Sequence, residues 1–77
     1  MLPYSFYYVL TAEAAIKIGI ISEKWEEISP HDVTEQAVMK VATSRHRSYK
    51  EAERFALESG DDTWVLSPDG KAQWVPQ

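Results

Sequence analysis

Few residues of this 77-residue chain have the types and spacing that catalysis requires. His31 and His46 are the only histidines, and His31 stands directly before Asp32, which suggests half of a proton-transfer pair. Neighbouring residues rarely orient one another for general acid–base chemistry, so we interpret His31 as an ordinary residue at a helix start. The chain has no nucleophile-elbow motif, no phosphate-binding glycine loop and no carboxylate–histidine metal spacing. The sequence therefore predicts a protein that is not an enzyme, with no cofactor and no metal ion.

A group of basic residues is the clearest electrostatic feature of the sequence. Residues 40–54 contain five cations and two carboxylates, a net charge of +3, whereas the segments before and after them are acidic. Such a basic island could contact nucleic acid, phosphate or an acidic protein surface. The alternative is a solvated linker whose charges keep a small protein in solution. The five cations are Lys40, Arg45, Arg47, Lys50 and Arg54.

An acidic group, Glu23, Glu26 and Glu27, also has two interpretations. It is either the outer face of an amphipathic helix or a surface for a basic partner. Trp25 lies among these glutamates, but it falls on the apolar stripe of the segment, so we expect it in the core.

An apolar patch on a predicted sheet is the third candidate surface. Tyr7, Val9, Val65 and Val75 would share the sheet face turned away from the helices. In so small a protein an uncovered patch often marks a partner interface. The patch would allow a homodimer through this outer face.

Composition limits what the chain can be. Seventy-seven residues form one small domain, residues 1–77, with a formal net charge of −4. The absence of cysteine rules out disulfides and thiolate metal sites and is consistent with a reducing compartment. No apolar run approaches the roughly 20 residues that span a bilayer, and the N-terminus lacks signal-peptide features. We expect a soluble, cytoplasmic protein without a membrane partner.

The two ends of the chain predict strands. Residues 4–10 are aromatic and β-branched, and alternation places Tyr4, Phe6, Tyr8 and Leu10 on the core face. Near the C-terminus, the turn sequence of residues 67–70 contains proline, aspartate and glycine in the order of a type I turn with a glycine bulge. That turn places Trp64 opposite Trp74, and we expect both tryptophans to be buried against the helices.

Two capping boxes predict helices in the middle of the chain. Asp32 with Glu35 begins a helix that runs to about Ser44, and Ser48 with Glu51 begins another that ends at Gly60. Residues 45–47 form a short polar link between them.

The segment 11–28 allows either one helix or two. Thr11 is a plausible N-cap. One continuous helix would align an apolar stripe but place Gly19 in its middle, at a cost of about 1 kcal/mol. A break at Gly19 would bury Ile20 and let Ser22 cap a short second helix. We favour the break.

The pattern of Ala15, Gly19 and Trp25 in this segment resembles the helix-turn-helix of excisionase-like regulators. The resemblance implies a DNA-binding second helix. That helix would present three glutamates and only one cation, Lys24, to the phosphate backbone. We therefore expect the segment not to enter a DNA groove, and any nucleic-acid affinity to come from the basic island.

These observations predict an α+β fold: a three-stranded antiparallel sheet, made of the N-terminal strand and the C-terminal hairpin, packed on three or four inserted helices. They favour a small non-enzymatic binding protein (adaptor, inhibitor or regulator) that docks onto another macromolecule, and we expect that macromolecule to be another protein. The alternative is a nucleic-acid-binding regulator that uses the helix-turn-helix-like segment or the basic island.

Overall fold

The computed structural model describes residues 2–28, 33–60 and 62–76 of the chain. Within them a single sheet lies between two helical layers, which confirms the predicted α+β class. The elements in chain order are β1 (Tyr7–Thr11), α1 (Ala12–Lys17), α2 (Glu35–Val41), β2 (Ser44–His46), α3 (Tyr49–Ser59), β3 (Thr63–Leu66) and β4 (Ala72–Val75).

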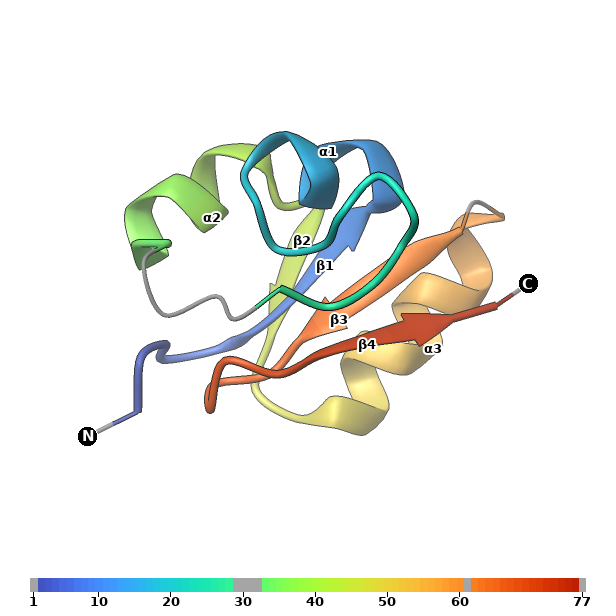
Figure 1. Ribbon diagram of the computed structural model, residues 1–77. Helices are drawn as coiled ribbons and strands as arrows, with labels where there is room; N and C mark the ends of the chain where they lie inside the picture. Colours follow the sequence, from blue (N-terminus) through green and yellow to red (C-terminus); the bar gives the residue numbers. More distant parts are fainter. Residues whose placement is uncertain (1, 29–32, 61, 77) are drawn as a thin grey trace.

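The sheet has four antiparallel strands in the order β2-β1-β3-β4, not the predicted three (Figure 1). The fourth is β2, which the sequence analysis treated as a polar link. Helix α2 ends at Val41, and Ala42 is already extended, with φ −66° and ψ 139°. The next residues then pair with β1, Tyr8 opposite Arg45. An edge strand of three polar residues has no apolar alternation, which is why the pattern did not predict it.

The C-terminal hairpin has the predicted register. The Ser67 N–H donates to the Lys71 carbonyl at 2.8 Å, and the Gly70 N–H donates to the Ser67 carbonyl at 2.9 Å. Gly70 has a φ of +90°, as the bulge requires. Trp64 consequently stands opposite Trp74.

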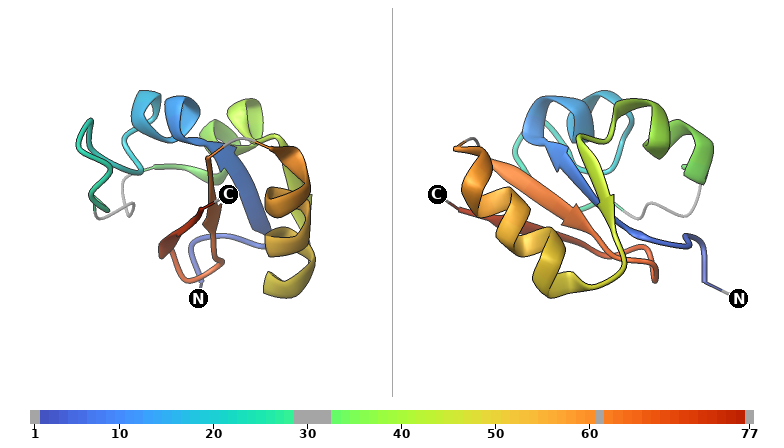
Figure 2. Two further views of the ribbon diagram at one scale, coloured as in Figure 1. Left: turned by 90° about the vertical axis from the view of Figure 1, so that its right-hand side faces the viewer. Right: turned by 180° about the vertical axis from the view of Figure 1, so that it is seen from behind.

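One face of the sheet packs against α1, α2 and the loop after α1 (Figure 2). Its core contains three of the four predicted alternate residues of the N-terminal segment, with Phe6 partly buried against it, together with residues of the hairpin and of the two helices. Trp64 is buried in this core, but Trp74 is 46% exposed, so the expectation that both tryptophans are buried is wrong for Trp74. The buried members are Tyr4, Tyr8, Leu10, Ala15, Ile20, Ile21, Val38, Trp64, Leu66 and Ala72.

Helix α3 covers the opposite face of the sheet. Val9, Val65 and Val75 are buried there against Ala52 and Ala56, with Tyr7 packed at the margin. The prediction of an uncovered apolar patch was therefore wrong. The two small alanines let α3 approach the sheet closely, so the patch is the second half of the core. Tyr7, Val65 and Val75 do not form an exposed partner surface, and a homodimer through this outer face has no open surface to use.

Side-chain caps begin all three helices that the structure describes. Thr11 accepts from the Ala14 N–H, Thr34 from the Ala37 N–H and Ser48 from the Glu51 N–H. The predicted N-caps Thr11 and Ser48 are confirmed, and Gly60 ends α3 in the left-handed conformation, with φ +79°. For α2 the cap is Thr34, and Asp32, the cap predicted from the sequence, lies outside the described residues.

The chain does break at Gly19, whose φ is +84°. Ile20 is fully buried, as the break predicted. The second helix does not form. Instead Ser22 accepts from the N–H groups of Lys24 and Glu26, and Ile21 bridges to Glu27, so residues 21–27 form a turn. Trp25 sits in that turn with a φ of +63°, and its side chain is 36% exposed rather than in the core.

No helix in the described part of the chain is both long enough and apolar enough to span a bilayer.

Candidate functional site

The free edge of β2 is the starting point of the candidate site. The Val9 carbonyl accepts from the Thr43 N–H at 2.7 Å, so the backbone groups of Val9 face β2. Along a strand, the backbone N–H and C=O groups of alternate residues point to the same neighbouring strand. In an antiparallel pair, two residues opposite one another either both direct these groups toward each other or both direct them away. Arg45 stands opposite Tyr8, between the two pairs that bond across to β1. Its N–H and C=O therefore point away from β1, toward the outside of the sheet.

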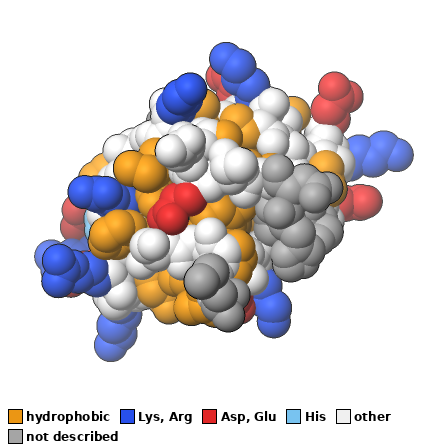
Figure 3. Space-filling model, turned by 90° about the vertical axis from the view of Figure 1, so that its left-hand side faces the viewer, with side chains coloured by type: hydrophobic (Ala, Val, Ile, Leu, Met, Phe, Trp, Pro, Cys, Tyr) orange, Lys and Arg blue, Asp and Glu red, His pale blue; other side chains and the backbone are white. Residues whose placement is uncertain are grey.

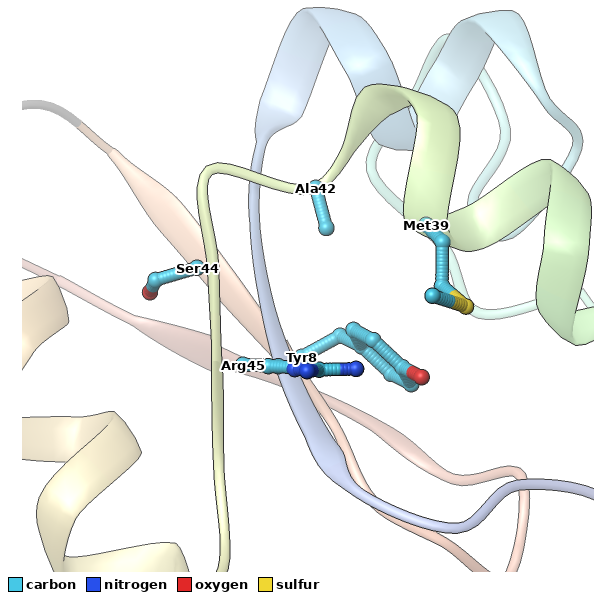
Figure 4. Close-up of a pocket in the computed structure, with 5 residues that line it drawn as sticks. All are labelled: Tyr8, Met39, Ala42, Ser44 and Arg45. Atoms are coloured by element: carbon cyan, nitrogen blue, oxygen red, sulfur yellow. The ribbon is translucent and has the colours of Figure 1, made fainter.

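A hollow of about 280 Å³ lies beside this edge, lined by Tyr8, Met39, Ala42, Ser44 and Arg45 (Figure 4). Tyr8 and Arg45 are opposite residues of β1 and β2, so their side chains lie on the same face of the sheet. Met39, which is 49% exposed, and Ala42 come from the end of α2 and lie above them. We call Arg45 and this hollow the β2 site.

Arg45 is held by an aromatic ring rather than by a carboxylate. Its guanidinium carbon lies 4.7 Å from the centroid of the Phe6 ring, a cation–π contact. Among the described residues the one ion pair joins Arg54 to Glu58 at 3.3 Å, so Arg45 has no carboxylate partner there. The stacked guanidinium keeps its hydrogen-bond donors for a ligand.

Glu35 lies close to Arg45 but is occupied by other donors. It accepts from the hydroxyl of Tyr8, from the Ser5 N–H at 2.9 Å and from the Ser5 hydroxyl at 3.3 Å. The hydrogen bond from Tyr8, together with the Ser5 N–H, lowers the pKa of the Glu35 carboxyl. Burial, and then the bond to Glu35, raises the pKa of Tyr8 to about 12. Figure 3 shows an acidic side chain among hydrophobic ones on this face, with Lys and Arg side chains along the margin.

These shifts do not prepare the site for proton transfer. A useful general acid or base has a pKa near the working pH, whereas the pKa values of Glu35 and Tyr8 both move away from neutrality. His46 lies on the other face of the sheet, with Nε2 2.8 Å from the Ser44 hydroxyl and its ring 5.4 Å from that of Phe55. No group of three metal-ligating side chains occurs within the described ranges, and His31 lies outside them. The arrangement can bind a ligand by charge, hydrogen bonds and apolar contact.

The structure divides the predicted basic island between two places. Arg45 lies at the β2 site, with Lys40 in the last turn of α2 and Arg47 just after β2. Lys50 and Arg54 instead line a shallow hollow of about 440 Å³ along α3, beside Leu57 and two glutamates. Arg54 is partly neutralised there by Glu58.

The acidic group lies on the turn after α1, near the other edge of the sheet. Glu27 Oε1 accepts from the Ala72 N–H at 3.4 Å, and the Trp25 ring contacts that of Trp74 edge-to-face, 5.6 Å between centroids. Glu23 and Glu26 are exposed on the same turn. Glu27 and Trp25 thus hold the turn against β4, while Glu23 and Glu26 are exposed to solvent.

Arg45 is the one hollow-lining residue that the sequence analysis named as a candidate, and the other residues in and beside the β2 site were missed. Phe6 and Tyr8 were assigned to the core, Glu35 to a helix cap, and Met39 to no surface. No sequence signal pairs Tyr8 with Arg45, because the pairing depends on β2, which the pattern did not predict. The sequence gives one local signal of a binding surface, an apolar residue next to a basic one at the end of α2, Met39 and Lys40.

The chain matches no protein-family model, no curated protein and no solved structure. The helix-turn-helix resemblance therefore stays a prediction, and the functional argument rests on the geometry.

Proposed function

We propose that the protein is a small non-enzymatic binding protein that docks onto another protein through the β2 site. The observation that supports this most directly is Arg45, an exposed arginine without a carboxylate partner among the described residues, at an open strand edge beside an apolar hollow. Interface hot spots combine arginine with aromatic and apolar anchors in this way. A chain without cysteine suits a reducing compartment, so we place this activity in the cytoplasm.

Charge favours a protein partner over nucleic acid. Nucleic-acid binding depends on several cations that neutralise successive phosphates. Here the five cations are spread over α2, β2, the residue after β2 and α3, one of them is paired, and Glu35 adds a negative charge close to Arg45. The chain as a whole has a net charge of −4. A nucleic-acid-binding regulator remains the alternative, with the same basic residues as its contacts.

The test compares matched charge reversals as baits in a lysate of the source organism. Arg45→Glu removes the central cation, and Lys24→Glu makes the same change in charge on the turn near β4. We expect a nuclease-resistant protein to bind the wild type and the Lys24→Glu variant and to be lost with Arg45→Glu. Equal capture by all three would contradict the β2 site. Capture that nuclease abolishes would support the nucleic-acid alternative.

A further inference from the structure

The two edges of the sheet are not equivalent. At the β4 edge, Ala72 directs its N–H outward, and the protein's own Glu27 accepts that bond, while Trp25 packs on Trp74. At the β2 edge, the outward N–H and C=O of Arg45 meet no neighbouring strand of the described residues, because β2 is the last strand in the order β2-β1-β3-β4. An open edge with unpaired backbone groups is a template for an added strand.

The side chains around the β2 edge restrict what such a strand contains. A residue placed directly opposite Arg45 would have its side chain on the same face as the guanidinium, within reach of a carboxylate. The hollow begins beside it, toward Met39 and Ala42, in the direction of Thr43. Thr43 itself donates its N–H back to Val9, so β2 ends there, but side chains alternate along the added strand, and its residue two positions farther in this direction again faces this side. An apolar side chain there would enter the hollow.

The Arg45 guanidinium is free to pair with a carboxylate of a partner protein, because the acidic side chain close to it has other hydrogen-bond donors. Glu35, the nearest acidic side chain of the site, already accepts from Tyr8 and Ser5. Arg47 stands two residues after Arg45, and Lys40 lies in the last turn of α2, so further cations come from the segments before and after β2. An acidic partner segment complements them, whereas two copies of β2 related by a two-fold axis at Arg45 would place the two arginines opposite one another.

We infer that β2 accepts an extended segment of a partner protein as a fifth, antiparallel strand. The segment has the pattern acidic–any–large apolar, read in its own direction of chain, with the acidic residue opposite Arg45 and the apolar residue in the hollow. The inference rests on the proposed function and deepens it by naming the chemistry of the partner. Two backbone hydrogen bonds to Arg45 provide the register, and the charge and the hollow provide the specificity.

The experiment uses the acetylated and amidated peptide Thr-Thr-Glu-Thr-Leu-Thr-Thr as a probe with the full chain. Amide spectra of labelled protein would follow the Arg45 N–H, and we expect its signal to shift and its hydrogen exchange to slow on binding. A matched peptide with an N-methyl group on the glutamate keeps the charge but loses one backbone donor. Another replaces glutamate by lysine. Each change should weaken binding about tenfold or more.

Charge exchange tests the pairing itself. The Arg45→Glu variant should bind the glutamate peptide more weakly and the lysine peptide more tightly than the wild type does, while Arg45→Gln should bind both weakly. The amide spectra report whether each variant is folded. Equal affinity for the N-methyl peptide, or no binding of the probe, would overturn strand addition. If the lysate partner still depends on Arg45 in that case, docking stands and only the strand geometry fails. If the Arg45→Glu variant also captures the lysate partner as well as the wild type does, both docking at the β2 site and strand addition are contradicted.

Discussion

At the scale of single residues, Tyr8 connects the core to the β2 site. Its ring is buried between Tyr4 and Phe6, with edge-to-face contacts at 6.4 and 6.3 Å, and its hydroxyl donates to Glu35. Phe6 in turn supports the Arg45 guanidinium. The position of the one unpaired cation of the site therefore depends on aromatic packing, and the neighbouring carboxylate is held where it does not form an ion pair with Arg45.

Glu35 gives a prediction about acid stability. Its pKa is lowered in the folded protein, so the folded state binds this proton less tightly than the unfolded chain does. The contribution is present in full above the unfolded pKa and is lost as the pH falls through the folded value. Urea unfolding at a series of pH values should show a loss of stability below about pH 4.5 that Glu35→Gln reduces. Glu23→Gln, on the exposed turn, should keep the wild-type profile. An unchanged profile for Glu35→Gln would contradict the bonds to Tyr8 and Ser5.

The two tryptophans of the hairpin give a second prediction. Trp64 is 6% exposed, so Trp64→Ala should lower the free energy of unfolding by about 3–5 kcal/mol. Trp74 is 46% exposed and packs on Trp25, so Trp74→Ala should cost about 1–2 kcal/mol. Trp64→Phe is the matched control, because Trp64 Nε1 is buried without a hydrogen-bond partner in the described structure and its removal relieves that penalty. Equal losses for the two alanine variants in urea unfolding would contradict the observed difference in burial.

At the scale of elements, the sequence predicted what local chemistry decides. The caps Thr11 and Ser48, the stop at Gly60 and the hairpin register are each set by a few neighbouring residues, and all four are confirmed. β2 was missed because an edge strand is stabilised by its pairing with β1, which no local pattern encodes. The second helix after Gly19 failed for a similar reason. Ser22 is a good cap, but Ile21 and Glu27 pair and close the segment into a turn.

Gly19 gives a prediction that separates the two interpretations of segment 11–28. In the structure its φ is +84°, and a Cβ would meet nothing within 4 Å, so Gly19→Ala should cost only the conformational strain, about 1–2 kcal/mol. Gly19→Asn should cost less, because asparagine tolerates this conformation better. A continuous helix predicts the opposite sign, since alanine is favoured over glycine in a helix by about 1 kcal/mol. Thermal or urea unfolding decides between them, and Gly60→Ala is a second site of the same kind.

At the scale of the whole molecule, the sequence predicted the alternation of the strands but not which elements cover the two faces. Val9, Val65 and Val75 were correctly placed on one face, yet that face is covered by α3. The inward stripe of α3 contains alanines, and it fits either sheet face equally well by pattern alone. The candidate site shared this difficulty. Arg45 was identified from its charge, but its neighbours Phe6, Tyr8 and Met39 become visible only when α2 and β2 are placed around β1.

Self-association of the molecule gives the last prediction. Within the described residues both sheet faces are covered and the Ala72 N–H at the β4 edge is bonded to Glu27, so we consider pairing of two copies through β2. Two β2 strands related by a two-fold axis at Arg45 would place the two arginines directly opposite one another, where like charges destabilise the pair. A short edge strand with a central cation is a known protection against such pairing. The wild type should therefore be a monomer in sedimentation and light-scattering measurements over a wide dilution series.

Removing the charge of Arg45 should allow two copies to pair through their β2 strands. Arg45→Val replaces the cation by a residue that favours strands, so we expect dimers whose fraction rises with concentration. Arg54→Val removes one cation from the outer side of α3 and should remain monomeric, which separates the effect of the edge from the loss of net charge. Arg45→Lys should also remain monomeric, because it keeps the repulsion. A wild-type dimer, or an Arg45→Val variant that stays monomeric at every concentration, would contradict the view that Arg45 keeps the β2 edge from pairing with itself and leaves it to an acidic partner strand.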